Sequence, residues 1–337
     1  MERPIISVVM SIYNEPEKWL KNSIESILNQ TFSNIEFIIV NDNPGRELNG
    51  LIVRGFMEVD SRIRLIENTD NLGLTRSLNI AFKEAHGTYI ARMDADDISL
   101  TERLETQYQF MEANPEIGVC GCWAQFFGNI HIFSQKVYKV PLSPSQIQTA
   151  LPFYNPLIHS TSFFRKSVIE PFEQLYDEKY INAQDYMLWE KLLNCNIVLA
   201  NLENILLRYR VSKSQISSTM KQRQNAVAST IRLRVLEKLG LYFSEDEKSL
   251  MISLTNREPL IQESQLNDAE ELLIKTKTFL KETDPSNAFL VDQLIYSEWL
   301  YCFLNFAFKR KNAIRFFNST LFQFRFLSMK SLVKILI

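Results

Sequence analysis

The first hundred residues alternate between short apolar runs and longer stretches in which apolar residues recur at helical spacing. We predict strands at the apolar runs, which are residues 5–13, 35–42, 62–68 and 87–93. We predict helices at the stretches between them, which are residues 17–30, 47–59 and 74–85. Because strands and helices alternate, the connections should be right-handed crossovers, and the sheet mostly parallel with helices on both faces.

Beyond residue 115 the pattern becomes mixed and then changes to helices alone. Strand-like runs occupy residues 117–127, 131–140, 157–164, 196–202 and 205–211. A helical stretch at 184–193 lies among them, as does another at 101–111 just before them. After Ser212 only helical patterns follow, so we place a boundary near residue 215. The sequence thus predicts an α/β domain at 1–215 and a helical region at 216–337.

Polar residues directly follow three of the first four predicted strands. The first strand ends in YNE (13–15), the second in NDN (41–43) and the fourth in DADD (94–97). In open α/β sheets, ligands bind at the carboxyl ends of the strands. The three polar segments therefore predict one binding site at that edge of the sheet.

The composition is that of a globular protein, with 46% hydrophobic and 23% charged residues among 337. The four cysteines match no zinc spacing, which favours a reduced compartment. The N-terminus lacks the pattern of a signal peptide, and no apolar run reaches the ~20 residues that span a bilayer. We therefore expect a cytoplasmic protein that is not integral to the membrane.

The acidic cluster Asp94, Asp96 and Asp97 has three candidate explanations. Ser99 and Glu102 have the spacing of a capping box for the helix that follows, which leaves the three aspartates unexplained. A calcium loop fails because its fifth position would be Ile98 and its turn glycine would be Ser99. What remains is either a partial divalent-metal site or a solvated acidic turn. A metal there would hold diphosphate in place of a glycine-rich phosphate loop, which the chain lacks.

Beyond these local patterns, the segments 6–42 and 71–104 resemble the start of a family-2 glycosyltransferase of the GT-A fold. The resemblance continues through NPLIHSTSFFRKSVI (155–169) and QDYMLWEKLL (184–193) to LLRYRVSKSQIS (206–217), with the motifs in the family's order. It implies a GT-A domain with a mixed, mostly parallel sheet and an activity that transfers sugar from a nucleotide donor.

The resemblance also implies roles for individual residues. Asp42 would bind a uracil-like base, with Asn41 at a position that is often a second acid, and Asp94 would face the ribose. Asp96 and Asp97 would hold Mn²⁺ or Mg²⁺ on the diphosphate, and Asp185 would be the catalytic base. The nucleotide would pack against the end of the first strand, which is formed by Tyr13, Asn14 and Glu15.

Three further positions have open interpretations. His159 is either a structural histidine or, as in similar proteins, a residue near the acceptor. Arg210 either contacts phosphate and so binds the nucleotide, or pairs with an acid at the sheet edge. Relatives often carry a histidine two residues later, where this chain has Ser212. Asp185 alone would be read as a helix cap, and only the resemblance favours catalysis.

Charge separates the tail from the rest of the chain. From Trp299 onward there is no acid and there are seven cations. Because the formal net charge of the whole chain is −2, residues 1–298 carry a net charge of −9. The segment 309–337 is either a helix packed on the second domain or an interfacial helix on anionic lipid. In the second case the protein would lie peripherally on the inner face of the cell membrane. The acidic body argues against nucleic-acid binding.

Together these observations predict an inverting, metal-dependent glycosyltransferase. It would move sugar from a nucleotide donor, with UDP-sugar preferred over dTDP-sugar, to a glycan or lipid-linked oligosaccharide in surface-polysaccharide synthesis. The alternatives are donor hydrolysis alone and a non-catalytic module that binds nucleotide-sugar or membrane within a polysaccharide assembly.

Overall fold

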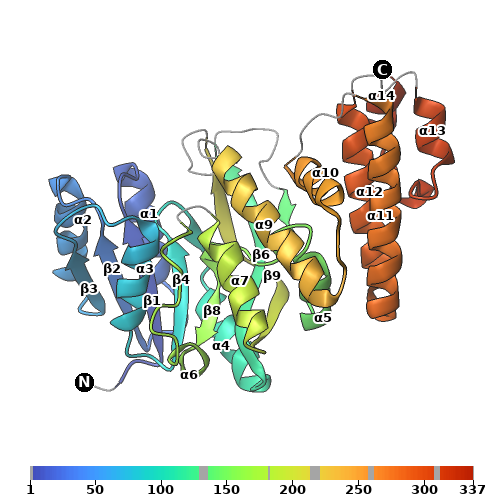
Figure 1. Cartoon of the computed structure of the whole chain (residues 1–337). Helices are drawn as coiled ribbons and strands as arrows, with labels where there is room; N and C mark the ends of the chain where they lie inside the picture. Colours follow the sequence, from blue (N-terminus) through green and yellow to red (C-terminus); the bar gives the residue numbers. More distant parts are fainter. Residues whose placement is uncertain are drawn as a thin grey trace. The chain divides into compact units, whose positions relative to one another are not determined.

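The structure is a computed structural model that describes residues 3–128, 136–180, 183–212, 221–256, 262–306 and 312–336. The chain forms two compact units (Figure 1). The first unit is Met1–Pro144 with Pro156–Thr219, and the second is Ser145–Asn155 with Met220–Ile337. The predicted boundary near 215 falls outside the described residues and stays a prediction.

The first unit opens with the alternating strands and helices that the sequence predicts. They are β1 (Ile6–Ile12), α1 (Glu17–Leu28), β2 (Ile35–Asn41), α2 (Glu47–Met57), β3 (Ile63–Glu67), α3 (Leu74–Lys83) and β4 (Tyr89–Asp94). β1 and β2 are almost wholly buried, as their continuous apolar runs require. All seven predictions are confirmed, with ends that differ by at most two residues.

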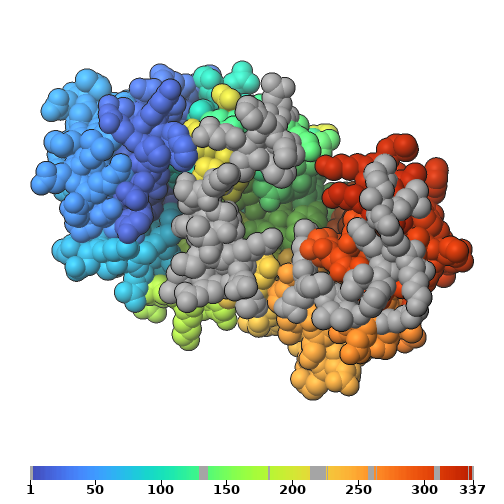
Figure 2. Space-filling view, turned by 90° about the horizontal axis from the view of Figure 1, so that it is seen from above, coloured from blue at the N-terminus to red at the C-terminus, as the bar shows by residue number. Residues whose placement is uncertain are grey.

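In the sheet of the first unit these four strands have the order β3-β2-β1-β4, and β4 is followed by β8 (Phe163–Arg165), β6 (Ile117–Gly128), β9 (Val198–Val211) and β5 (Ile98–Ser99). β1 pairs in parallel with β2 on one side and with β4 on the other. The connections therefore reverse direction at β1, which is the point where open α/β sheets bind ligands. Figure 2 shows the molecule from above the view of Figure 1, with the first strand–helix units in blue and cyan.

The rest of this unit is β5 (Ile98–Ser99), α4 (Arg103–Ala113), β6 (Ile117–Gly128), β7 (Val137–Tyr138), β8 (Phe163–Arg165), α6 (Lys166–Ile169), α7 (Gln184–Asn194) and β9 (Val198–Val211). β4 and β6 both pair antiparallel with β8, whereas β6 and β9 pair in parallel. The sheet is thus mixed, as predicted. Of the run 131–140, residues 131–135 lie outside the described part.

Two predictions for this part were wrong in detail. The run 157–164 is a strand only at its end, because the Thr161 and Ser162 hydroxyls donate to the carbonyls of Ile158 and His159 and fold a 3₁₀ turn. The two strands predicted at 196–211 are one strand, β9. The polar Glu203 and Asn204 form a bulge in its pairing with β6 rather than a break.

The second unit is helical and has its own core, as predicted for the C-terminal region. Its helices are α5 (Pro144–Ala150), α9 (Lys221–Leu239), α10 (Glu245–Thr255), α11 (Glu263–Thr283), α12 (Ala288–Asn305), α13 (Ala313–Asn318) and α14 (Met329–Leu336). Phe316 of the tail is buried and stacks on Trp299. None of the helices in the described ranges is long and apolar enough to cross a membrane.

Candidate functional site

Asp42 follows β2 and is almost fully buried. Its Oδ1 accepts hydrogen bonds from the Leu72 N–H at 2.8 Å and from the Asn68 side chain at 2.8 Å. Its Oδ2 accepts from the Gly73 N–H at 2.9 Å, and Gly73 has a positive φ of 84°. Asp42 therefore fixes the loop that leads into α3.

The residues after β1 lie beside those after β2, because the Asn43 side chain donates to the Tyr13 carbonyl at 3.2 Å. Tyr13 is 46% exposed, and its carbonyl accepts a hydrogen bond from Asn49 at 2.8 Å. Asn49 also donates to Asn41, the residue that stands where the family often has a second acid. Burial, together with the charge of Asp94, raises the pKa of Glu15. The Glu15 carboxyl group therefore lies within electrostatic range of the acidic cluster.

The three acids of the DADD segment lie together in space. Ligand oxygens of Asp94, Asp96 and Asp97 are all within 4.8 Å of one another. Arg92 lies two residues before Asp94 on β4 and is almost fully buried. It forms a bidentate ion pair with Asp94. This pair neutralises one acid and leaves the other two to account for the local negative charge.

Arg210 on β9 holds the other end of the acidic turn. Its N–H donates to Asp97 Oδ1 at 2.7 Å, and its Nε donates to the Asp96 carbonyl at 2.6 Å. Its guanidinium lies between the rings of Trp19 and Phe127, 4.3 Å from each centroid. Arg210 is therefore bonded to the acidic turn through its backbone N–H and its Nε, and both of its predicted roles stay predictions.

The predicted capping role of Ser99 and Glu102 is wrong. Ser99 lies in β5 and pairs with β9, whereas α4 begins only after Glu102 and has no local side-chain cap. Gln30, at the end of α1, accepts instead from the Leu104 N–H at 3.0 Å and donates to Ser99 Oγ and the Leu100 carbonyl. A distant side chain thus supplies the cap.

The residues at the acidic turn fit a divalent cation. Asp97 is almost fully buried, and its Oδ2 has no hydrogen-bond partner among the described residues. Burial and the charges of Asp96 and Asp94 raise the pKa of Asp97 well above its usual range. A buried carboxylate beside two further carboxylates matches the hard oxygen ligands that Mg²⁺ and Mn²⁺ prefer.

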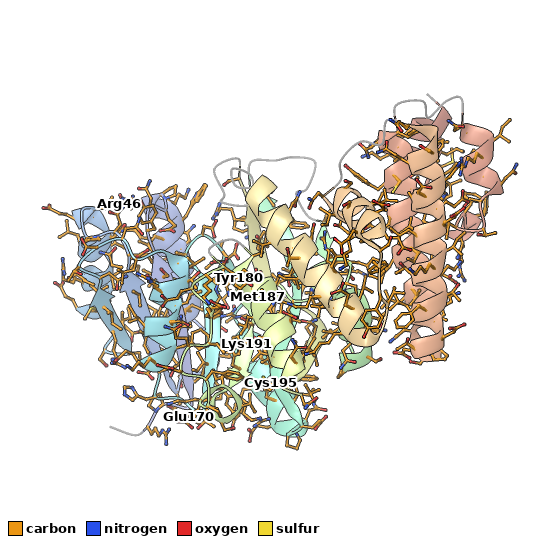
Figure 3. All side chains as sticks on the ribbon, in the orientation of Figure 1. Arg46, Glu170, Tyr180, Met187, Lys191 and Cys195 are labelled. Carbon is orange, nitrogen blue, oxygen red and sulfur yellow. The ribbon has the colours of Figure 1, made fainter. Side chains whose placement is uncertain are left out.

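Asp185 lies in the first turn of α7, and Ala183 before it has a positive φ of 62°. In Figure 3, Met187 marks the N-terminal part of α7, toward the edge that holds Arg46 before α2, and Cys195 marks the opposite end. The charges of Asp185 and Asp94 both act on the buried Tyr176 and, with burial, raise its pKa.

His159 makes a hydrogen bond through Nε2 to the Tyr176 hydroxyl at 2.8 Å, and its ring packs edge-on against Trp189 of α7. Burial and the nearby Arg92 lower the pKa of His159 well below its usual value, so the ring is neutral at pH 7. In the structure, His159 thus contacts the hydroxyl group of Tyr176.

The sequence analysis did not identify Arg92 or Tyr176. Arg92 carries a detectable signal, because a charged residue inside a buried strand requires a partner, and Asp94 two residues later lies on the same face. Tyr176 carries none, since it lies in an irregular segment with no periodicity.

Comparisons with solved structures identify the fold as GT-A. S. aureus TarS in complex with UDP-GlcNAc matches with a TM-score of 0.55 and 16% identity, over 87% of this chain and 88% of that one. Mannosyltransferase PcManGT from Pyrobaculum calidifontis in complex with GDP-Man and Mn²⁺ also matches at 0.55, with 15% identity, over 87% and 85%.

Sequence comparisons identify the family. The model described as Glycosyl transferase family 2 matches residues 7–172. An uncharacterized glycosyltransferase of Methanocaldococcus jannaschii is 39% identical over 215 residues, which are 63% of this chain and 72% of the relative. The O-antigen biosynthesis glycosyltransferase WbnJ of Escherichia coli is 35% identical over 213 residues, covering 61% and 80%. The chain belongs to glycosyltransferase family 2 and is a glycosyltransferase.

Proposed function

We propose that this enzyme is an inverting, metal-dependent transferase that uses a nucleotide-sugar donor, with UDP as the nucleotide. The observation that carries the proposal is the acidic turn, in which ligand oxygens of Asp94, Asp96 and Asp97 lie within 4.8 Å of one another. The proposed nucleotide contacts are Tyr13, Asn14, Glu15, Asp42, Asp94, Asp96 and Arg210.

Asp185 is the proposed base. Inverting transfer is a single displacement at the anomeric carbon, in which the acceptor oxygen bonds to that carbon as the bond to the diphosphate breaks. A carboxylate within reach of the acceptor hydroxyl removes its proton, an effect of roughly 10²–10⁴-fold. Asp185 lies in a different segment from the acidic turn, so it can serve the acceptor while the turn serves the leaving group.

Asp96 and Asp97 are the proposed metal ligands. A bound Mn²⁺ or Mg²⁺ would act as a Lewis acid that stabilises the departing diphosphate. This chain's residues prepare the turn for it: Arg210 fixes the backbone of Asp96 and one oxygen of Asp97. Arg92 keeps the third acid, Asp94, neutralised.

The Asp185→Asn variant tests the proposed transferase function. Radiolabelled-donor assays should show transfer reduced by about 10²-fold or more, with UDP binding in the presence of Mn²⁺ unchanged by calorimetry. The control is Glu116→Gln, an exposed acid at the start of β6, which should behave as wild type. Wild-type transfer rates in the Asp185→Asn enzyme would refute the base assignment, and transfer that persists in EDTA would refute the metal role.

The donor and the chemistry have alternatives that the same protein can decide. A thermal-shift screen should show the largest rise with UDP-sugars, and a larger rise with dTDP-sugars would favour the second donor class. Release of free sugar without transfer would indicate donor hydrolysis alone. Binding without either reaction would indicate a non-catalytic module.

For the acceptor we propose a glycan or lipid-linked oligosaccharide of a surface polysaccharide, with His159 on the acceptor side. The support comes from relatives: the O-antigen enzyme above and, at 28% identity over 239 residues, the amylovoran biosynthesis glycosyltransferase AmsE of Erwinia amylovora. A panel of lipid-linked acceptors tests it, and transfer only to free sugars would contradict it.

Peripheral binding of the tail to an anionic membrane, on the cytoplasmic side, is part of the same proposal. Lys309, Arg310 and Lys311 lie outside the described residues. Lys330 and Lys334 are exposed, whereas Arg325 binds Asp292 at 3.0 Å within the second unit. Because Phe316 and Leu321 are core residues, charge reversal is a cleaner test than deletion.

Lys330→Glu with Lys334→Glu should reduce sedimentation with phosphatidylserine vesicles, since each cation near the surface adds about 1 kcal/mol. Neutral phosphatidylcholine vesicles are the control. Unchanged sedimentation would favour a tail that serves only to pack the second unit.

A further inference from the structure

The segment between α6 and α7 is held from two sides within the first unit. From α3, the Asn79 side chain donates to the Tyr176 carbonyl and accepts from the Tyr176 N–H, both at 2.9 Å. From α7, Lys191 donates to the carbonyls of Gln174 and Leu175 at 2.7 and 3.1 Å. Figure 3 shows Lys191 on α7 between Met187 and Cys195. The segment therefore bridges two helices that have no direct sequence connection.

These two helices begin at different halves of the proposed site. α3 starts directly after the Leu72–Gly73 backbone that binds Asp42, on the proposed nucleoside side. α7 starts at Gln184, and the proposed base, Asp185, lies in its first turn. A rigid link between them would fix the distance between donor and base.

Tyr176 occupies the centre of this link. Its side chain is fully buried, its ring packs edge-on against Phe82 of α3, and its hydroxyl meets His159 at 2.8 Å. The charged groups that act on it are Arg92, Asp185 and Asp94. Nothing in this arrangement places Asn79 or the Tyr176 backbone at the nucleotide itself.

We propose that Asn79 and Tyr176 are positioning residues for sugar transfer. Asn79 fixes the backbone of Tyr176, and Tyr176 holds His159, whose ring packs against Trp189 of α7. This inference rests on the proposed function, because it assigns no chemical step to either residue. Their effect is on the alignment of acceptor and donor.

Asn79→Ala removes both backbone hydrogen bonds at a half-buried position. We expect kcat to fall by about tenfold or more, since small misalignments of reacting groups are costly. The donor KM and the calorimetric affinity for UDP with Mn²⁺ should stay at wild-type values. Tyr176→Phe keeps the ring and removes only the hydroxyl, and it should show the same pattern. If Asn79→Ala does not fold, Tyr176→Phe alone tests the inference.

The matched control is Arg76→Ala. Arg76 lies on the same helix and pairs with Glu178 of the same segment at 2.7 Å, but this pair is largely exposed. It should leave kcat unchanged, because exposed ion pairs contribute little.

Three results would overturn the inference. Wild-type kcat in both variants would show that the link has no role in transfer. An equal loss of UDP affinity and kcat would place Asn79 in donor binding instead. A reduced number of UDP sites with normal kcat per site would show a structural role only. If the wild-type protein neither binds UDP nor transfers sugar, the proposed function fails and this inference fails with it.

Discussion

Asp97 shows how a single residue can be unfavourable for the fold and useful for binding. Its raised pKa means that the folded state binds a proton more tightly than the unfolded state does. The corresponding stabilisation is complete below the ordinary value of 3.8 and is lost as the pH rises through the folded pKa. At neutral pH without metal, the buried carboxylate therefore costs stability.

We expect Asp97→Asn to stabilise the metal-free protein at pH 7 by roughly 1–2 kcal/mol, a shift of about 2–4 °C per kcal/mol for a unit of this size. Mn²⁺-dependent UDP binding should be lost at the same time. Calorimetric melting with and without Mn²⁺ measures both effects, with Glu116→Gln as the control. A lower melting temperature would mean that the carboxylate is well compensated by contacts other than the one from Arg210.

His159 should make the stability of the fold depend on pH in the direction opposite to that of Asp97. Its pKa is lowered in the folded state by burial and by Arg92. Below about pH 6.5, where a free histidine takes up a proton, the unfolded state gains a proton that the folded state rejects. Stability should fall there by up to about 1.4 kcal/mol per pH unit.

His159→Gln should remove this slope. Urea unfolding followed from pH 7.5 to pH 5 should give a wild-type curve that falls more steeply than the variant's below pH 6.5, while the two run parallel above it. Parallel curves over the whole range would show that His159 titrates normally.

Among the elements, those that pack by a simple period could be predicted from sequence. β1, β2 and α1 each bury one continuous run or one helical face, so their ends were correct to within two residues. The errors occur where side chains bond to distant or neighbouring backbone, as Thr161 does at the turn after Ile158 and Gln30 does at α4. The approach of the polar segments after β1 and β2 was predicted because the carboxyl ends of parallel strands meet at one edge, whereas the Tyr176 link has no local pattern.

The non-local cap on α4 gives a prediction at this scale. Gln30 is buried and makes four hydrogen bonds, including the one it accepts from Leu104. Gln30→Ala should destabilise the protein by about 1–3 kcal/mol, because buried partners lose their bonds. Gln30→Glu keeps only the acceptor role and should be at least as unfavourable. Ser99→Ala, which removes one bond, is the milder control, and denaturant unfolding ranks the three.

At the scale of the molecule, the polypeptide enters the second unit twice. Residues 145–155 belong to that unit, although they lie within the sequence of the first. Asn287 donates to Ser145 and Thr149 at 3.1 Å, and Phe153 belongs to the second core. A boundary drawn from the end of strand-like patterns cannot detect this, because seven helical residues carry little periodicity.

Truncation after residue 219 should therefore not yield a clean first unit. It would leave α5 without Asn287 and Phe153 without its core, so we expect increased binding of a hydrophobic dye and loss of soluble protein on heating. Phe153→Ser in the truncated chain should reduce dye binding, whereas the same change in the full chain should destabilise it by about 3–5 kcal/mol, as for other buried aromatics. The decisive measurement is whether Phe153→Ser improves the truncated chain, by reducing its dye binding, while it destabilises the full chain. If the truncated chain is as stable as the intact one and Phe153→Ser has no effect in it, residues 145–155 do not depend on the second unit.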